Sequence, residues 1–182
     1  MIPPGTSVPE FTLRGEDGSE FTRANLEGKT SVLVFYPFAF SPVCTDQLSL
    51  YEEVLDEFKA RGATLYGVSC DAGYSQKAFR EKLGVSIEQL SDFEPKGQAC
   101  RAFDAYHQGG FPQRALAIVG PDCVVAWSYQ AQSPAELPGA NLIFDGLDQL
   151  SAASSGCRSS ARLPFPASPL RITSGDPSMA GW

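Results

Sequence analysis

Residues 31–48 constrain the fold more than any other stretch of this chain. Residues 31–36 (SVLVFY) are apolar on both faces, which is typical of a strand buried on both sides within a sheet. Pro37 ends that strand, and Ser41 followed by Pro42 begins a helix, because serine is a preferred N-cap and proline suits the first helical position. The sequence therefore predicts a central strand that leads through a short loop into a helix.

Cys44 falls at about the third residue of this predicted helix. It starts a stripe whose members follow at spacings of 4, 3, 4 and 3, so they share one helical face at about 100° per residue. The stripe consists of Cys44, Leu48, Tyr51, Leu55 and Phe58. We expect one amphipathic helix, ended by Gly62, with the Cys44 thiol turned toward the sheet rather than toward bulk water.

The rest of the chain alternates between strand and helix patterns. Further strands are predicted at residues 9–13, 19–22, 64–69, 89–92, 113–119 and 123–129, and helices at 75–83, 95–103 and 141–150. Turn signals join the first two strands and the last two strands into antiparallel pairs, whereas residues 89–92 resemble a short edge strand. This order predicts an α/β, thioredoxin-like fold with a central mixed β-sheet flanked by helices and an N-terminal β-hairpin.

The composition changes near residue 151. Residues 1–150 have the size of one domain with its own core, whereas residues 151–182 contain 8 Ser, 4 Pro and 3 Gly and no clear hydrophobic period. We therefore expect a disordered tail over 151–182. The alternative is a docked tail anchored by Leu163, Phe165 and Trp182.

Composition excludes several classes of protein. A formal net charge of −7 argues against a nucleic-acid partner, because phosphate contacts need clustered Lys and Arg. The N-terminus lacks a signal-peptide pattern, and no apolar run is long enough to span a bilayer, so we expect a cytoplasmic protein without membrane contact. The five cysteines include no C-x-x-C pair, which removes the simplest zinc site and the simplest dithiol oxidoreductase, and no cofactor is expected.

Cys44 is the cysteine whose position suggests chemistry. A thiol reacts as its thiolate, which the helix dipole and the free amides of a first helical turn favour. Burial and the nearby Asp46 oppose ionisation, so a cation is needed that the local sequence does not supply. Two interpretations are open for Ser41: it is a helix N-cap, or its hydroxyl hydrogen-bonds the thiolate or its substrate. Pro37 is either a strand terminator or a shield against water.

The segment Pro37-Phe-Ala-Phe-Ser41-Pro-Val-Cys44 resembles the Pro-x-x-x-Thr/Ser-x-x-Cys motif of the peroxiredoxins, the AhpC/TSA thiol peroxidases. Residues 9–13, the segments Gly67-Val-Ser and Leu90-Ser-Asp, and Arg114 before a late strand are also similar to that family. The resemblance covers roughly residues 1–150. It is closest to the branches that resemble alkyl hydroperoxide reductase E and bacterioferritin-comigratory protein.

The resemblance implies a role for each matching residue. Cys44 becomes the peroxidatic cysteine, Ser41 the hydroxyl that orients peroxide, Pro37 the shield and Arg114 the missing cation. Many members carry Glu three residues after the cysteine to orient the arginine. Here that position is Gln47, which can hydrogen-bond a guanidinium without adding charge, so arginine positioning is expected to depend on neutral hydrogen bonds.

The oxidised cysteine would be a sulfenic acid that a second thiol must resolve. Cys100, on a short predicted helix, is the best internal candidate, because Cys70 and Cys123 border strands and Cys157 lies in the predicted tail. We favour a one-cysteine cycle completed by a low-molecular-weight thiol or a thioredoxin-like reductant. His107, the one histidine, lies in a Gly-flanked loop and is expected to be solvated.

The hypothesis is a thiol peroxidase that reduces hydrogen peroxide and organic hydroperoxides through Cys44. The resemblance also implies a homodimer. A rival interpretation is a peroxide-sensing redox switch or a holdase-type interaction protein that uses the same cysteine. Turnover separates these interpretations, because a sensor is oxidised once and passes its oxidation to a partner.

Overall fold

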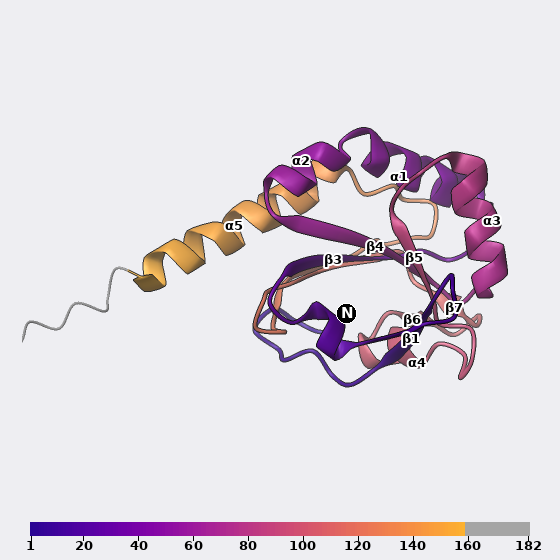
Figure 1. Cartoon of the computed structure of the whole chain (residues 1–182), viewed down its shortest axis with the longest axis horizontal. Helices are drawn as coiled ribbons and strands as arrows, with labels where there is room; N and C mark the ends of the chain where they lie inside the picture. The colour runs from indigo at the N-terminus through magenta and orange to yellow at the C-terminus, as the bar shows by residue number, and fades with distance from the viewer. Residues whose placement is uncertain (159–182) are drawn as a thin grey trace, which may run out of the picture.

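The computed structural model describes residues 1–158 and is built around a seven-stranded sheet (Figure 1). Its strand order is β2-β1-β5-β4-β3-β8-β9. The strands are β1 (Thr12–Gly15), β2 (Glu20–Thr22), β3 (Thr30–Phe35), β4 (Ala63–Ser69), β5 (Glu88–Ser91), β8 (Ala115–Val119) and β9 (Val125–Gln130). The β3–β4 and β4–β5 pairs are parallel, whereas β1–β2, β1–β5, β3–β8 and β8–β9 are antiparallel, so the sheet is mixed, as predicted.

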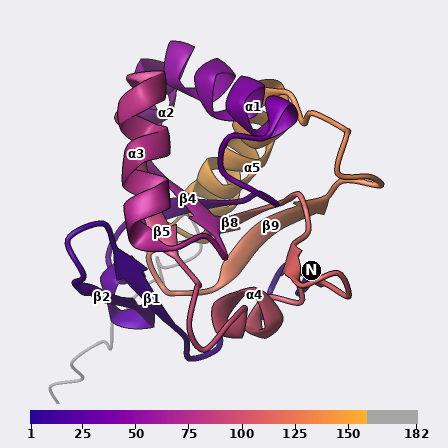
Figure 2. The ribbon, with the colours of Figure 1, turned by 90° about the vertical axis from the view of Figure 1, so that its right-hand side faces the viewer.

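Helices lie on both faces of this sheet (Figure 2). The helices are η1 (Arg23–Leu26), α1 (Pro42–Glu53), α2 (Leu55–Ala60), α3 (Gly73–Leu83), α4 (Gln98–Ala102) and α5 (Ala140–Arg158). In Figure 2, α1, α3 and α5 lie on one side of the sheet, and α4 lies on the other side. A separate two-stranded ribbon, β6 (Tyr106–His107) with β7 (Phe111–Pro112), was not predicted, because its strands are only two residues long.

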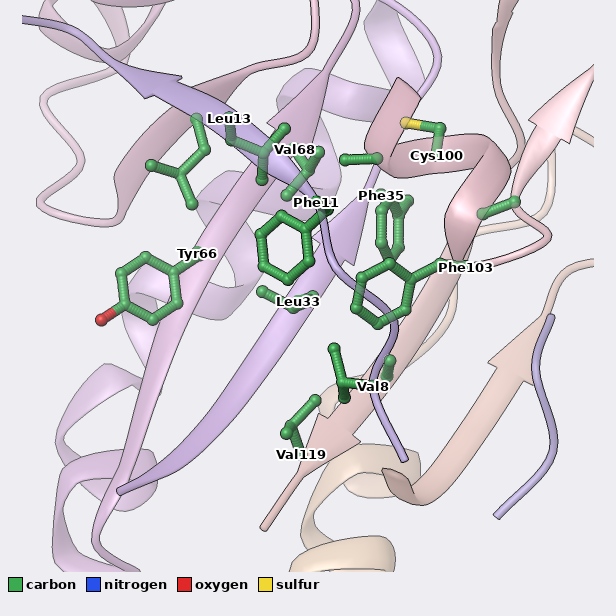
Figure 3. Close-up of a cluster of buried hydrophobic side chains, with 14 of the residues drawn as sticks. Val8, Phe11, Leu13, Leu33, Phe35, Tyr66, Val68, Cys100, Phe103 and Val119 are labelled. Atoms are coloured by element: carbon green, nitrogen blue, oxygen red, sulfur yellow. The ribbon is translucent and has the colours of Figure 1, made fainter. Parts of the chain in front are cut away.

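The side-chain alternation of the strands divides the core into two clusters. On β3, Val32 and Val34 enter the cluster under α1, α2, α3 and α5, whereas Leu33 and Phe35 enter the cluster under α4 and the N-terminal segment. The second cluster is drawn in Figure 3, where Phe11, Phe35 and Phe103 lie together. Cys44 belongs to the first cluster and Cys100 to the second, so the sheet separates them.

Two predicted elements are wrong in detail. The helix that starts at Pro42 does not continue to Gly62, because Val54 leaves the helical conformation (φ −111°, ψ 18°) and splits it into α1 and α2. A β-branched residue is a weak helix former, and the buried stripe continues across the break. The strand predicted at 89–92 is not an edge strand, since β5 lies between β1 and β4.

The predicted disordered tail is also wrong for its first eight residues. Helix α5 continues to Arg158, although its buried positions end near Leu150 and residues 151–155 are exposed. Within this extension, Ser154 and Ser155 each donate a hydroxyl hydrogen bond to the backbone carbonyl four residues earlier at 3.0 Å. Residues 159–182, including the anchors proposed for a docked tail, lie outside the described residues.

Among the helices of residues 1–158, none combines the length and apolar character needed to cross a membrane.

A substitution of Phe103 tests how much the cluster under α4 contributes to the stability of the fold. Its ring packs against Phe11 and Phe35 with centroids 5.6 and 5.4 Å apart, and it is almost completely buried. We expect Phe103→Ala to lower the free energy of unfolding by about 3–5 kcal/mol, because it leaves a cavity that its neighbours cannot fill. Urea denaturation measures this change, with the exposed Tyr74→Ala as control. Equal urea midpoints for the two variants would show that Phe103 does not stabilise the fold in this way.

Candidate active site

The candidate site forms where β3 ends and α1 begins. The backbone N–H of Tyr36 still bonds to Val68 of β4 at 3.0 Å, and the chain then turns through Pro37 to Ser41 before the helix starts at Pro42. Cys44 is therefore in the first helical turn, as predicted, and it is completely buried. Pro37 is also buried directly after the strand.

A carboxylate from the next strand holds this loop in place. Asp71, which follows β4, accepts hydrogen bonds from the Ala39 backbone N–H and the Ser69 hydroxyl, both at 2.8 Å. Phe40 adopts a positive φ of 65°, which is uncommon for a bulky residue and is found most often where function requires it. Its ring packs against Phe79 of α3 at 5.1 Å. Sequence reasoning missed Asp71, whose only signal was its place just after a buried strand.

Ser41 takes the N-cap position without using its hydroxyl as a cap. Its backbone is extended (φ −70°, ψ 147°), and its carbonyl accepts the first helical bond from Thr45 at 2.9 Å. Its side chain makes no capping hydrogen bond. The predicted N-cap position of Ser41 is confirmed for its backbone, and its hydroxyl is available to bind a ligand.

Arg114 lies beside Cys44, although 70 positions separate them in the chain. It directly precedes β8, which pairs with β3, and this pairing brings it to the end of β3. Its Nη2 donates to Cys44 Sγ at 3.3 Å, its Nη1 donates to Gln47 Oε1, and its Nε donates to the Pro134 carbonyl at 2.9 Å. Arg114 is 2% exposed, and its three hydrogen-bond partners hold the guanidinium in one orientation.

A second layer of hydrogen bonds orients Gln47. Its Nε2 donates to Tyr51 Oη at 3.2 Å, and the Tyr51 hydroxyl donates to the Pro138 carbonyl at 2.8 Å. This arrangement turns the amide oxygen of Gln47 toward Arg114. Burial raises the pKa of Tyr51 to about 12, so the hydroxyl keeps its proton near neutral pH. The sequence analysis placed Tyr51 only in the apolar stripe, and its polar role was missed.

Arg114 carries the one positive charge of this network, and none of the residues described above offers it a carboxylate. Gln47 and the carbonyls of Pro134 and Pro138 are neutral acceptors. A buried guanidinium is costly unless an anion compensates it, and the group nearest to it that can ionise is the Cys44 thiol. The arrangement therefore places a fixed positive charge and an N–H donor directly at the Cys44 sulfur.

The other cysteines whose side chains are described do not lie near Cys44. Cys70, Cys100 and Cys123 belong to the cluster on the opposite face of the sheet, so the structure does not support Cys100 as a partner that reaches Cys44. Sequence position alone could not show on which face α4 packs. The side chain of Cys157 lies outside the part of the chain that the structure describes.

His107 is exposed, as expected, and lies on β6. Its Nδ1 accepts a hydrogen bond from the Gly109 N–H at 2.9 Å, and its ring stacks on Phe111 at 4.6 Å. The hydrogen bonds of the described residues do not join it to Cys44 or Arg114. A cysteine–histidine pair is therefore not part of this site.

The fold and the site define a thioredoxin-like protein with a buried, arginine-paired cysteine at a helix N-terminus. The AhpC/TSA family model matches residues 4–128, and the chain belongs to this family. The predicted family and fold are thus confirmed.

Relatives with known names support the same assignment. The chain is 28% identical to alkyl hydroperoxide reductase E of Mycobacterium tuberculosis over 154 residues, which cover 84% of this chain and 100% of that protein. It is 31% identical to the chloroplastic peroxiredoxin Q of Oryza sativa subsp. japonica over 70% of this chain, and the match spans only 59% of the rice protein.

A solved structure, Enterococcus faecalis AhpC, has a TM-score of 0.74 and 24% identity to the chain, and covers 91% of this chain and 100% of its own. At that identity it supports the fold alone.

Substitutions of Gln47 test how the Arg114 guanidinium is positioned. We expect Gln47→Leu to slow the reaction of Cys44 with peroxide on the order of tenfold, the typical value of a hydrogen bond to a charged group. Gln47→Glu keeps an acceptor at the same place and should retain more of the rate. Rapid-mixing kinetics measures both, with Glu53→Gln, an exposed position at the far end of α1, as the control. A Leu variant that reacts like the parent protein would show that Gln47 does not position Arg114.

Proposed function

We propose that this protein is a thiol peroxidase that reduces hydrogen peroxide and organic hydroperoxides. The observation that carries the proposal is the contact between Arg114 Nη2 and Cys44 Sγ at 3.3 Å, inside a buried first helical turn. A peroxidase needs a stabilised thiolate and donors for the oxygen that leaves, and this pair supplies both. The names of the relatives, alkyl hydroperoxide reductase E and peroxiredoxin Q, agree with that chemistry.

In the proposed reaction, the Cys44 thiolate attacks one oxygen of the peroxide. The S–O bond forms as the O–O bond breaks, and the leaving oxygen takes a proton to become an alcohol or water. Cys44 is oxidised to sulfenic acid while the peroxide is reduced. Arg114 stabilises the thiolate before the step and the negative charge on oxygen during it.

The groups around Cys44 have complementary proposed roles. The N–H groups of Val43 and Cys44 precede the first helical hydrogen bond, so they can donate to a peroxide oxygen. The free hydroxyl of Ser41 orients the peroxide, and the buried Pro37 keeps water away from the thiolate. Asp71 acts indirectly, by holding the backbone of the loop.

We propose that an external thiol or a thioredoxin-like protein reduces the sulfenic acid. The three other cysteines whose side chains are described are buried on the far side of the sheet. A one-cysteine cycle therefore needs no large rearrangement of the core. The cytoplasmic location and the lack of a nucleic-acid partner are predictions from composition.

The first test measures hydrogen peroxide consumption by the reduced protein in the presence of a thiol reductant. We expect Cys44→Ser to abolish consumption and Arg114→Gln to lower the rate constant by about 100-fold, the usual loss when one such donor is removed. Arg101→Gln, an exposed arginine on α4, is the matched control and should react normally.

Unchanged consumption in the Cys44→Ser variant would overturn the proposal. Oxidation that stops after one equivalent with every reductant tried would instead favour the peroxide sensor. Intact mass after one equivalent of peroxide identifies the product: one added oxygen for sulfenic acid, or a loss of two hydrogens for an internal disulfide.

We also propose a homodimer that contacts the active-site loop. Phe38 is about half exposed, and its ring packs on Phe111 of β7 at 4.9 Å, while Phe40 in the same loop is similarly exposed. Two exposed aromatic rings beside the site form an apolar surface that a second copy could cover.

Sedimentation tests the homodimer. The parent chain should sediment at twice its mass of 19.5 kDa, and Phe38→Asp should shift it toward the monomer, because a buried charge would be unpaired. Phe93→Asp, at an exposed ring outside that loop, is the control. A parent protein that sediments as a monomer would exclude the homodimer without affecting the peroxidase proposal.

A further inference from the structure

Three side chains with metal-binding chemistry meet on the face of the sheet opposite Cys44. Cys70 directly follows β4, Asp92 directly follows β5, and Cys100 lies on α4. Figure 3 shows Cys100 on α4, in the same cluster as Phe35 and Phe103. The peroxidase chemistry proposed above uses none of the three.

The donor atoms of this group are close together and shielded from solvent. The two sulfur atoms and a carboxylate oxygen all lie within 4.8 Å of one another. Cys100 and Asp92 are almost completely buried, and Cys70 keeps 9% of its surface exposed. Three separate segments supply the three donors, so tertiary structure and not local sequence creates the group.

Backbone hydrogen bonds hold Asp92 in position. Its Oδ1 accepts from the Ala99 N–H at 3.1 Å and its Oδ2 from the Cys100 N–H at 2.8 Å, while its own N–H bonds to the Ser69 carbonyl at 2.8 Å. These bonds cap the start of α4 and explain why a carboxylate is buried here. They do not explain two thiols beside it, and each carboxylate oxygen keeps a further lone pair.

The neighbouring acidic groups and burial disfavour the thiolate form of Cys100 when no cation is bound. The adjacent Cys70 thiol, burial and the Asp92 charge together raise the pKa of the Cys100 thiol, and burial raises the pKa of Asp92. A divalent cation would replace the thiol protons and compensate the buried negative charge. Two sulfur atoms and a carboxylate oxygen within 4.8 Å of one another therefore form a donor set that suits a cation.

We propose that Cys70, Asp92 and Cys100 bind one thiophilic divalent cation of the zinc type. Two thiolates and a carboxylate are ligands that zinc accepts, whereas magnesium and calcium require oxygen donors. Zinc–ligand bonds of about 2.0–2.3 Å place ligand atoms roughly 3.5–4 Å apart, so donors up to 4.8 Å apart need to approach by about 1.3 Å at most. Such a site would tie the ends of β4 and β5 to α4.

The test uses a background in which Cys44 and Cys157 are replaced by serine, so that those thiols cannot bind metal. Cadmium is the probe, because its thiolate complexes have an ultraviolet charge-transfer band. We expect one cadmium per chain with this band, and its loss in Cys70→Ser or Cys100→Ser. Cys123→Ser is the matched control, since Cys123 is another buried cysteine in the same cluster.

Two further measurements guard against variants that misfold. Asp92→Asn keeps an acceptor for the amide of α4 but loses the charge, so it should stay folded by circular dichroism and bind cadmium more weakly. Zinc at a hundredfold excess over its dissociation constant should raise the melting temperature of the background protein by about 5–10 °C. Cys123→Ser should show the same rise.

Several outcomes would overturn the proposal. They are the absence of a stoichiometric band, a band that persists without Cys70 and Cys100, or a loss of the band in Cys123→Ser equal to that in Cys100→Ser. A band seen only after denaturation would mean that metal binds the unfolded chain. Loss of two hydrogens from the background protein under mild peroxide, without metal uptake, would identify a redox-active thiol pair instead. Loss of peroxidase activity in Cys44→Ser bears on none of these results.

Discussion

The buried guanidinium of Arg114 is the group on which the rest of the site depends. Removing an arginine from water is expensive, and neutral acceptors recover only part of that cost. Gln47 and the Pro134 carbonyl add no negative charge, so among the three groups that Arg114 contacts only Cys44 could supply an anion. A glutamate at position 47 would share that charge. With glutamine at this position, Cys44 and Arg114 form a pair in which no carboxylate competes for the guanidinium.

The fold places this pair by fixing the ends of adjacent strands. Parallel β3 and β4 bring Asp71 to the loop that precedes α1, and antiparallel β8 brings Arg114 to the end of β3. The strained Phe40 is held between these anchors and α3. The same sheet separates Cys44 from the thiols near α4, so the two faces can carry different chemistry: the proposed peroxide reduction on one and the proposed metal site on the other.

The sequence predicted the parts of the site that depend on local patterns. The strand ended by Pro37, the helix begun at Pro42 and the place of Cys44 in its first turn follow from alternation, capping residues and helical periodicity. Patterns were less informative where a residue serves two purposes. Tyr51 fitted the apolar stripe, yet its hydroxyl orients Gln47, and the serine-rich composition after residue 150 concealed a helix that reaches Arg158.

By itself, the sequence determined that Cys44 would lie buried at a helix N-terminus and would require a cation that its neighbours do not provide. Periodicity and charge along the chain are local properties, so they could be read directly. Only the tertiary structure decided that Arg114 contacts the sulfur, that Tyr51 and Pro138 orient its anchor, and that Cys100 lies beyond the sheet. Those relations depend on strand order and on the face where each helix packs, and neither is encoded in any single stretch of residues.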